Sequence, residues 1–165
     1  MKIFGVVGWK NSGKTGLIER LLVEISCRGL SVSTIKHAHH NFDLDQEGTD
    51  SYRHRQAGAK EVVLSSKKRW AVISELRGSA EPSLEYLIEK ISPVDLILIE
   101  GFKTSGHEKI ETYRSETLEP LLLTQDKTIV ALASDNQNCE CRVPKFNLDD
   151  TYSIANFILN RVDLL

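Results

Sequence analysis

The sequence is poor in cysteine and has no long apolar run, and both absences narrow the class of protein. Three cysteines in 165 residues, an odd number, do not suggest a disulfide framework. Apolar runs such as Leu96-Ile97-Leu98-Ile99 have the length of a strand, whereas a helix needs about 20 apolar residues to cross a bilayer. The first residues carry no secretory signal pattern. We therefore expect a cytoplasmic protein without a membrane segment.

An excess of positive charge is also absent, which argues against a nucleic-acid partner. The chain has 21 Lys and Arg residues against 23 Asp and Glu residues, a formal net charge of -2. A polyanion would need a local basic patch, and the sequence shows no basic stripe. Internal repeats, low-complexity tracts and long linkers are missing as well. Residues 1–165 are therefore predicted to form one domain, of a size that buries a core.

One glycine-bearing segment carries the strongest functional signal. Gly8-Trp9-Lys10-Asn11-Ser12-Gly13-Lys14-Thr15 matches the phosphate-loop pattern GxxxxGK[ST] between an apolar strand pattern and an amphipathic helix pattern. The glycines let backbone N–H groups turn inward around phosphate, and the helix N-terminus adds its own N–H groups. Lys14 is expected to reach the β- and γ-phosphates, and the Thr15 hydroxyl to ligate Mg²⁺. The predicted nucleotide-binding residues here are Gly8, Lys10, Asn11, Ser12, Gly13, Lys14, Thr15 and Gly16, of which Lys10 could instead be a solvated lysine.

Strand and helix patterns alternate along the chain, which indicates a mostly parallel sheet covered by helices. Ligands of such sheets bind at the carboxyl ends of the strands. With the phosphate loop, this order predicts an α/β, three-layer P-loop NTPase fold with helices on both faces and a β-hairpin extension at about residues 60–76. The predicted strands are 2–7, 31–36, 61–65, 70–75, 95–99, 109–113 and 128–133, and the predicted helices are 15–27, 50–57, 82–91 and 149–162.

An acid follows the most apolar strand pattern. Residues 95–99 are followed by Glu100 and Gly101. Beside a phosphate loop, a carboxylate at the carboxyl end of the neighbouring strand can hold Mg²⁺ or polarise the attacking water. Glu100 lies at that end and Asp95 at the other, so we predict a catalytic and metal-binding role for Glu100. The alternative is an ordinary polar residue at a strand exit.

A polar, histidine-rich loop follows the second predicted strand. Lys36-His37-Ala38-His39-His40 precedes Asp43, Asp45 and Asp50. These residue types could form a zinc site, or they could belong to a switch-like loop that nucleotide orders. We favour the switch, in which Asp45 is catalytic, Asp50 lies near Mg²⁺, and His37 lies near phosphate or substrate. Spacing does not say which acid has which task.

Two further polar segments each keep two interpretations. Arg53 and Arg55, on a predicted helix, either contact an anionic ligand or lie on a solvated face. Cys139-Glu140-Cys141 is either a pair of reduced loop thiols or half of a zinc site. No second cysteine or histidine pair nearby completes such a zinc site.

The candidate position that reads the base lies at the end of a later strand pattern. The Asn-Lys-x-Asp signature of common guanine-binding proteins is absent. Ala131-Leu132-Ala133-Ser134-Asp135 nevertheless ends a strand pattern with an acid, which could accept hydrogen bonds from guanine N1–H and the 2-amino group. Because adenine lacks both donors, Asp135 in this role would favour GTP over ATP. The alternative is a loop acid without a ligand.

The combination of motifs resembles the MobB family of molybdopterin-guanine dinucleotide biosynthesis adapter proteins, over nearly the whole chain. The phosphate loop is shared by many families, whereas its combination with the histidine loop and the Glu-Gly-Phe-Lys strand exit is far more specific. The segments that carry the resemblance are Gly8–Thr15, residues 36–45, residues 50–59, Ile99-Glu100-Gly101-Phe102-Lys103 and Ala133-Ser134-Asp135.

The resemblance implies a P-loop protein that binds GTP with Mg²⁺ and hydrolyses it weakly. It implies a homodimer formed partly through extended β structure, for which residues 61–75 are the candidate here. The implied partners are the molybdenum cofactor guanylyltransferase, which attaches GMP to molybdopterin, and molybdopterin or its dinucleotide form. Carried over by position, the residues from Gly8 to Thr15 cradle phosphate, Glu100 is the second-strand acid, and Asp135 reads guanine.

Two other functions could use the same loop. A P-loop small-molecule kinase usually carries an arginine-rich lid, whereas the arginines between residues 53 and 114 are scattered. A nucleic-acid-associated ATPase fits poorly with the net charge of -2. The sequence therefore favours the GTP-binding adapter.

Overall fold

The chain forms two compact units. A computed structural model describes residues 1–38, 42–136, 138 and 140–165. Unit 1 comprises Met1–His37 and Leu84–Leu165, and unit 2 comprises Ala38–Ser83. One domain over residues 1–165 stays a prediction. No helix in the described ranges is long and apolar enough to cross a membrane.

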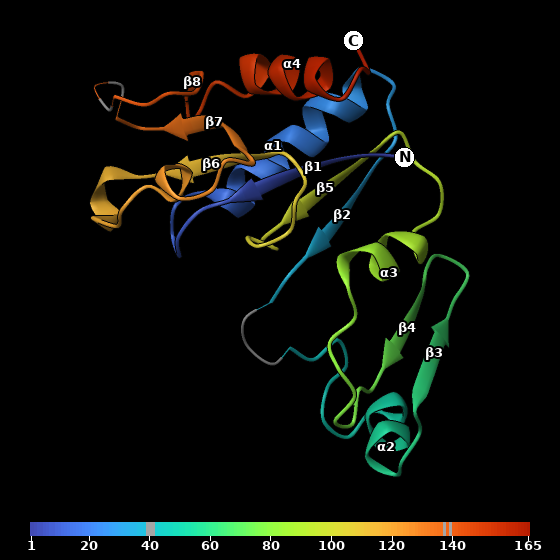
Figure 1. Cartoon of the computed structure of the whole chain (residues 1–165). Coiled ribbons are helices and arrows are strands. Elements are labelled where there is room, and N and C mark those ends of the chain that lie inside the picture. The colour runs from blue at the N-terminus through green and yellow to red at the C-terminus, as the bar shows by residue number, and fades with distance from the viewer. Residues whose placement is uncertain (39–41, 137, 139) are drawn as a thin grey trace. The chain divides into compact units, whose positions relative to one another are not determined.

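Unit 1 is built on a six-stranded parallel sheet with the order β2-β5-β1-β6-β7-β8 (Figure 1). Because the strands are parallel, their carboxyl ends meet at one edge, where the phosphate loop follows β1. The predicted mostly parallel α/β sheet is confirmed. The strands are β1 (Lys2–Val7), β2 (Val32–Lys36), β5 (Leu96–Glu100), β6 (Lys109–Tyr113), β7 (Ile129–Ser134) and β8 (Lys145–Asn147). The helices are α1 (Lys14–Cys27), α3 (Leu84–Glu89) and α4 (Thr151–Arg161), with 3₁₀ turns η1 (Ser115–Thr117) and η2 (Leu122–Thr124).

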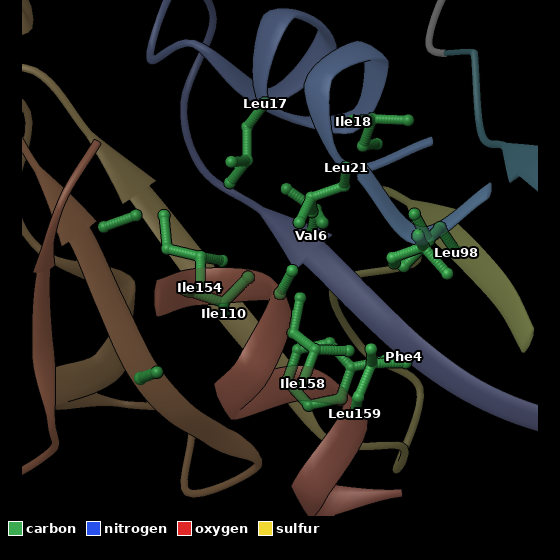
Figure 2. Close-up of a cluster of buried hydrophobic side chains, with 14 of the residues drawn as sticks. Phe4, Val6, Leu17, Ile18, Leu21, Leu98, Ile110, Ile154, Ile158 and Leu159 are labelled. Atoms are coloured by element: carbon green, nitrogen blue, oxygen red, sulfur yellow. The ribbon is translucent and has the colours of Figure 1, made fainter. Parts of the chain in front are cut away.

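Helices cover both faces of this sheet. Leu96 and Leu98 of β5 pack in one hydrophobic cluster with the buried faces of α1 and α4. Figure 2 shows Leu98 in this cluster. Ile97 and Ile99 of the same strand pack in another cluster with α3. Since side chains alternate along a strand, the two clusters lie on opposite faces of the sheet. All five residues of β5 are buried, as its apolar pattern predicts for a central strand.

Helix α1 starts where the phosphate loop ends. Gly13 precedes it with a left-handed backbone, φ 97°, and the helix begins one residue earlier than predicted. Its core-facing side chains recur at helical spacing, and each such burial contributes about 1.5–3 kcal/mol to folding. This packing fixes the helix N-terminus beside β1. The buried residues are Leu17, Ile18, Leu21 and Ile25, and Figure 2 shows the first three beside Val6.

Unit 2 contains helix α2 (Asp50–Gln56) and an antiparallel hairpin of β3 (Glu61–Ser65) and β4 (Trp70–Ser74). Both strands lie within one residue of the predicted ranges, so the hairpin is confirmed. One hairpin face carries Val63 and Val72 as direct cross-strand partners. Their exposed fractions are 65% and 45%, and that of Trp70 nearby is 69%. Exposed apolar side chains that lie side by side on a two-stranded hairpin favour association with another chain.

Arg55 organises unit 2 through its ion pairs. Its side chain is 8% exposed and pairs with Asp43 at 3.0 Å, with Glu75 at 2.5 Å, and with Asp45. The hydrogen bonds from Arg55 hold the pKa of the Asp45 carboxyl below its ordinary value. Arg55 therefore does not lie on a solvated face, and acids of the chain itself already pair with its charge. Arg55 instead ties the loop before α2 to Glu75, the residue that follows β4.

Candidate nucleotide-binding site

The phosphate loop has the backbone shape that its glycines predict. Gly8 has φ 150°, and a Cβ added there would lie 2.4 Å from both the Ser12 hydroxyl oxygen and the Thr112 carbonyl oxygen. The Ser12 hydroxyl lies 2.8 Å from the Thr112 hydroxyl, which donates to the Val7 carbonyl at 3.2 Å. Thr112 of β6, which the sequence did not single out, thus anchors the loop. The packing leaves no room for a side chain at Gly8.

Lys14 points back onto its own loop. Its ammonium donates to the carbonyls of Gly8 at 3.1 Å and Trp9 at 2.7 Å. Burial lowers the pKa of Lys14, Glu100 opposes that shift, and Lys103 and Lys36 add to the lowering. The ammonium groups of Lys36 and Lys103 thus both lie close enough to act on that of Lys14. A polyphosphate is the ligand whose charge would balance them.

Thr15 and Glu100 meet at the carboxyl edge of the sheet. The Thr15 hydroxyl donates to Glu100 Oε1 at 3.2 Å. The ammonium of Lys36 lies 3.2 Å from the same Oε1 atom. Hydroxyl and carboxylate oxygens are hard ligands of the kind that Mg²⁺ takes. Glu100 already pairs with a cation, the Lys36 ammonium, in this structure. The oxygens of Thr15 and Glu100 therefore fit the predicted Mg²⁺ site.

His37 lies beside Glu100, directly after β2. Its backbone N–H donates to the Glu100 carbonyl at 2.9 Å, and its ring stacks on Phe102 with centroids 4.7 Å apart. A Cβ on Gly101 would come within 3.0 Å of the His37 Cβ. Gly101 therefore permits the close approach of the two strand exits. A role for His37 near phosphate or substrate stays a prediction.

The other predicted members of the switch loop lie in unit 2. Asp45 pairs with Arg55, and Asp50 opens α2, 3.9 Å from Arg53. Their roles near Mg²⁺ and water stay predictions. His39, His40 and Cys139 lie outside the described residues. Within the described part of the chain, no group of three or more His, Cys, Asp or Glu side chains is arranged to hold a metal ion.

Asp135 follows β7 and has local hydrogen bonds. Its Oδ1 accepts from the Ser115 N–H at 2.9 Å, and its Oδ2 accepts from the Ser115 hydroxyl at 3.2 Å. The carboxylate thus caps the 3₁₀ turn η1. Asp135 is itself exposed, which leaves its edge accessible to a base. Its guanine-reading role stays a prediction.

Two basic side chains that the sequence did not assign lie beside the loop. The ammonium of Lys103 is 4.3 Å from the centroid of the Trp9 ring. A Cβ on Gly13 would lie 3.4 Å from Nε of Arg114. The two side chains come from the loops after β5 and β6, the strands on either side of β1, so only the fold brings them to the phosphate loop. Among the loop residues, Lys10 is exposed, and Gly16 has room for a side chain.

A pocket of about 380 Å³ adjoins the phosphate loop. Its apolar wall includes Val7, Leu122 and Ile129, and its polar wall includes Lys103 and Asp126. Lys103 therefore borders both the pocket and the loop. A ligand in this pocket would lie next to a nucleotide on the loop.

Comparison with known proteins identifies the family. A family model described as "Molybdopterin guanine dinucleotide synthesis protein B" matches residues 3–135. The molybdopterin-guanine dinucleotide biosynthesis adapter protein of Haemophilus influenzae is 38% identical over 161 residues, 96% of this chain and 88% of that protein. The Escherichia coli protein of the same name is 34% identical, covering 95% and 91%. The crystal structure of Bacillus subtilis MobB matches with a TM-score of 0.77 and 30% identity over 98% of both chains. The resemblance inferred from the motifs is confirmed, and the chain belongs to the MobB family.

Proposed function

We propose that the chain is a GTP-binding adapter protein with weak GTPase activity in the biosynthesis of the molybdopterin-guanine dinucleotide cofactor. In this role it assists the guanylyltransferase that attaches GMP to molybdopterin. The observation that carries the proposal is the meeting of Lys14, Thr15 and Glu100 at one edge of the sheet. Family membership supports the pathway.

In the proposed complex the triphosphate lies on the backbone amides of residues 8–15. Lys14 exchanges the carbonyls of Gly8 and Trp9 for phosphate oxygens. Thr15 and Glu100 would hold Mg²⁺. When bound, this ion neutralises negative charge on the β- and γ-phosphate oxygens.

The weak hydrolysis in this proposal involves Asp45. We assign this residue to the orientation of the attacking water, as part of the loop before α2. In the described structure its carboxylate accepts hydrogen bonds from Arg55. Asp45 would have to lose these charge-assisted hydrogen bonds before it could accept a proton from water. Only a small fraction of the protein would therefore be competent for hydrolysis at any time.

The partners of the proposed adapter follow from its surfaces and its pathway. The exposed stripe of Val63, Trp70 and Val72 on the β3–β4 hairpin supports a homodimer in which this face is covered. The pocket of about 380 Å³ beside Lys103 is our candidate contact site for molybdopterin or its dinucleotide form. We place the protein in the cytoplasm, where the guanylyltransferase is the expected macromolecular partner.

Calorimetric titration with GTP and ATP, each with Mg²⁺, tests the proposal. We expect GTP to bind at least about tenfold more tightly than ATP, because a site that pairs the guanine donors leaves polar groups unpaired with adenine. The same protein is then used to capture the purified guanylyltransferase. Equal affinities for the two nucleotides, or no complex with the transferase, would contradict the proposal.

Asp135→Asn tests the assignment of the base-reading residue. We expect GTP affinity to fall about tenfold and ATP affinity to stay unchanged, because an amide cannot accept hydrogen bonds at both positions. Ser115→Ala is the matched control, since it removes the hydroxyl that donates to Asp135 but leaves the carboxylate in place. Parallel losses for both nucleotides, in both variants, would mean that Asp135 only caps η1.

A P-loop small-molecule kinase remains the second candidate. The pocket beside the phosphate loop is the observation that favours it, because an acceptor bound there would lie near the γ-phosphate. A screen of small molecules for phosphoryl transfer from GTP and ATP separates the two functions. Transfer to any acceptor at a rate well above hydrolysis would support the kinase.

A further inference from the structure

The geometry points to Lys36 as an internal cation that holds the metal position beside Glu100 until a divalent ion arrives with the nucleotide. The inference deepens the proposed function and rests on it for the identity of the nucleotide. It concerns the control of the site. In the nucleotide-free protein, the ammonium of Lys36 excludes a divalent cation, and the cation and the triphosphate consequently bind together.

The position of Lys36 is set by the sheet. Lys36 is the last residue of β2 and is the register partner of Glu100, the last residue of β5. Partners on adjacent parallel strands project to the same face, so the two side chains start side by side. The resulting distance from Nζ to Glu100 Oε1 is 3.2 Å. Oε1 is also the atom that accepts from the Thr15 hydroxyl.

The burial of the two partners distinguishes this pair from an ordinary surface ion pair. The Glu100 side chain is 11% exposed, whereas that of Lys36 is 58% exposed. A carboxylate so far removed from water needs a positive partner, and Lys36 supplies it with a side chain that can leave easily. Lys36 thus compensates Glu100 without being locked in place.

The surrounding charges favour the release of Lys36 once phosphate is present. Besides Lys36 on Glu100, the site holds the ammonium of Lys14 on the loop carbonyls and that of Lys103 over the Trp9 ring, so positive charge gathers there. A triphosphate would attract all three ammonium groups. Lys36 can then move toward phosphate, and a divalent ion can take its place on Glu100. Two ligands that each favour the same rearrangement bind with positive coupling.

The experiment measures Mn²⁺ binding to the nucleotide-free full-length protein, using the electron paramagnetic resonance signal of free Mn²⁺. We expect Lys36→Gln to tighten Mn²⁺ binding roughly three- to tenfold relative to the unmodified protein, the range for the loss of one competing ion pair. Lys36→Arg should behave like the unmodified protein, because it keeps the cation. In the double variant Lys36→Gln with Glu100→Gln, the gain should disappear.

Lys2→Gln is the matched control for the change in net charge. Lys2 pairs with Asp163, also at 3.2 Å, but it lies at the first residue of β1, at the opposite end of the strand from the phosphate loop. Its replacement should leave Mn²⁺ affinity unchanged. An equal gain in Lys2→Gln would reduce the effect to general electrostatics and overturn the inference.

Equal Mn²⁺ affinity in the unmodified protein and Lys36→Gln, including no measurable binding to either, also overturns the inference. Because this measurement contains no nucleotide, its result is independent of GTP binding. Titration of the same proteins with Mg²⁺ and GTP reports separately on the proposed function. Failure of GTP to bind the unmodified protein would contradict the proposed function. Intact GTP binding together with unchanged Mn²⁺ affinity in Lys36→Gln would contradict only the role of Lys36.

Discussion

Replacing Lys14 with alanine is expected to lower the affinity for GTP with Mg²⁺ by about a hundredfold or more, the usual cost of removing one partner from a desolvated charge pair. The ammonium of Lys14 already lies over the loop, bonded to the carbonyls of Gly8 and Trp9, and burial lowers its pKa. Bound phosphate would replace two neutral acceptors with charged ones, which strengthens each hydrogen bond. Isothermal titration calorimetry measures the loss.

Lys90→Ala is the control for removing one positive charge elsewhere. The ammonium of Lys90 lies 4.7 Å from the centroid of the Tyr86 ring and belongs to none of the proposed contacts. GTP affinity of this variant should equal that of the unmodified protein. Circular dichroism and thermal unfolding of Lys14→Ala should show an intact fold. Unchanged GTP affinity in the Lys14 variant would mean that the phosphate loop is not the nucleotide site.

Acidification from pH 7 to pH 4 is expected to reduce the stability of the folded protein by up to about 3 kcal/mol through His107. Neither ring nitrogen of His107 has exposed surface or a hydrogen-bond partner among the described residues. Burial lowers the pKa of His107 to about 4, and Lys109 adds to the shift, whereas Asp126 and Glu85 oppose it. The ring is only partly buried, so solvent will reduce the full effect.

The sign of this effect follows from where the proton binds. An unfolded chain protonates histidine near pH 6.5, whereas the folded chain protonates His107 only near pH 4. Between these values the unfolded state binds more protons than the folded state. The contribution of His107 to the free energy of unfolding is therefore fully present above about pH 6.5, and it is lost as the pH decreases to 4. Glu111 acts in the opposite sense, because burial raises the pKa of its carboxyl. Glu111 is present in every variant compared, so its contribution to the pH dependence cancels in the comparison.

Urea denaturation across this pH range measures the free energy of unfolding. In His107→Leu we expect the loss between pH 6.5 and pH 4 to become clearly smaller, because the titrating group is gone and an apolar side chain needs no hydrogen bond. His54→Leu, which replaces an exposed histidine of α2, should keep the full pH dependence. The same pH dependence in His107→Leu and the unmodified protein would refute this role.

Local patterns carried most of the information about secondary structure. The spacing of Leu17, Leu21 and their neighbours predicted helix α1 to within one residue at its start. The apolar run ending at Glu100 predicted a strand buried on both faces, and β5 is such a strand. The ranges of β3 and β4 also agree with the predicted hairpin. These features depend on residues close together in the sequence, and a periodicity displays them directly.

The phosphate loop was predictable for the same reason, but its anchors were not. The order of residues from Gly8 to Thr15 encodes the turn and the helix start. Thr112 reaches the loop from within β6, and Lys103 and Arg114 reach it from the exits of β5 and β6. No spacing along the chain relates these residues to the loop. Their positions follow from the strand order of the sheet.

Arg55 shows how a tertiary environment can change the meaning of a residue. On the sequence it was either a ligand contact or part of a solvated helix face. In the structure its side chain is 8% exposed and surrounded by Asp43, Asp45 and Glu75. Two of these acids belong to the histidine-rich loop, so a residue predicted to be catalytic, Asp45, is also a structural ion-pair partner. Helical periodicity says which face a residue occupies but not what covers it.

Residues adjacent along the chain were enough to predict the α/β class, the phosphate loop and the acid at the end of a central strand, because backbone turns and apolar periodicity are short-range properties. The pairing of Lys36 with Glu100 arises differently. It requires β2 to lie beside β5 in one particular register, and that register is selected by the packing of both faces of the sheet. A contact between residues 64 positions apart is a property of the assembled core.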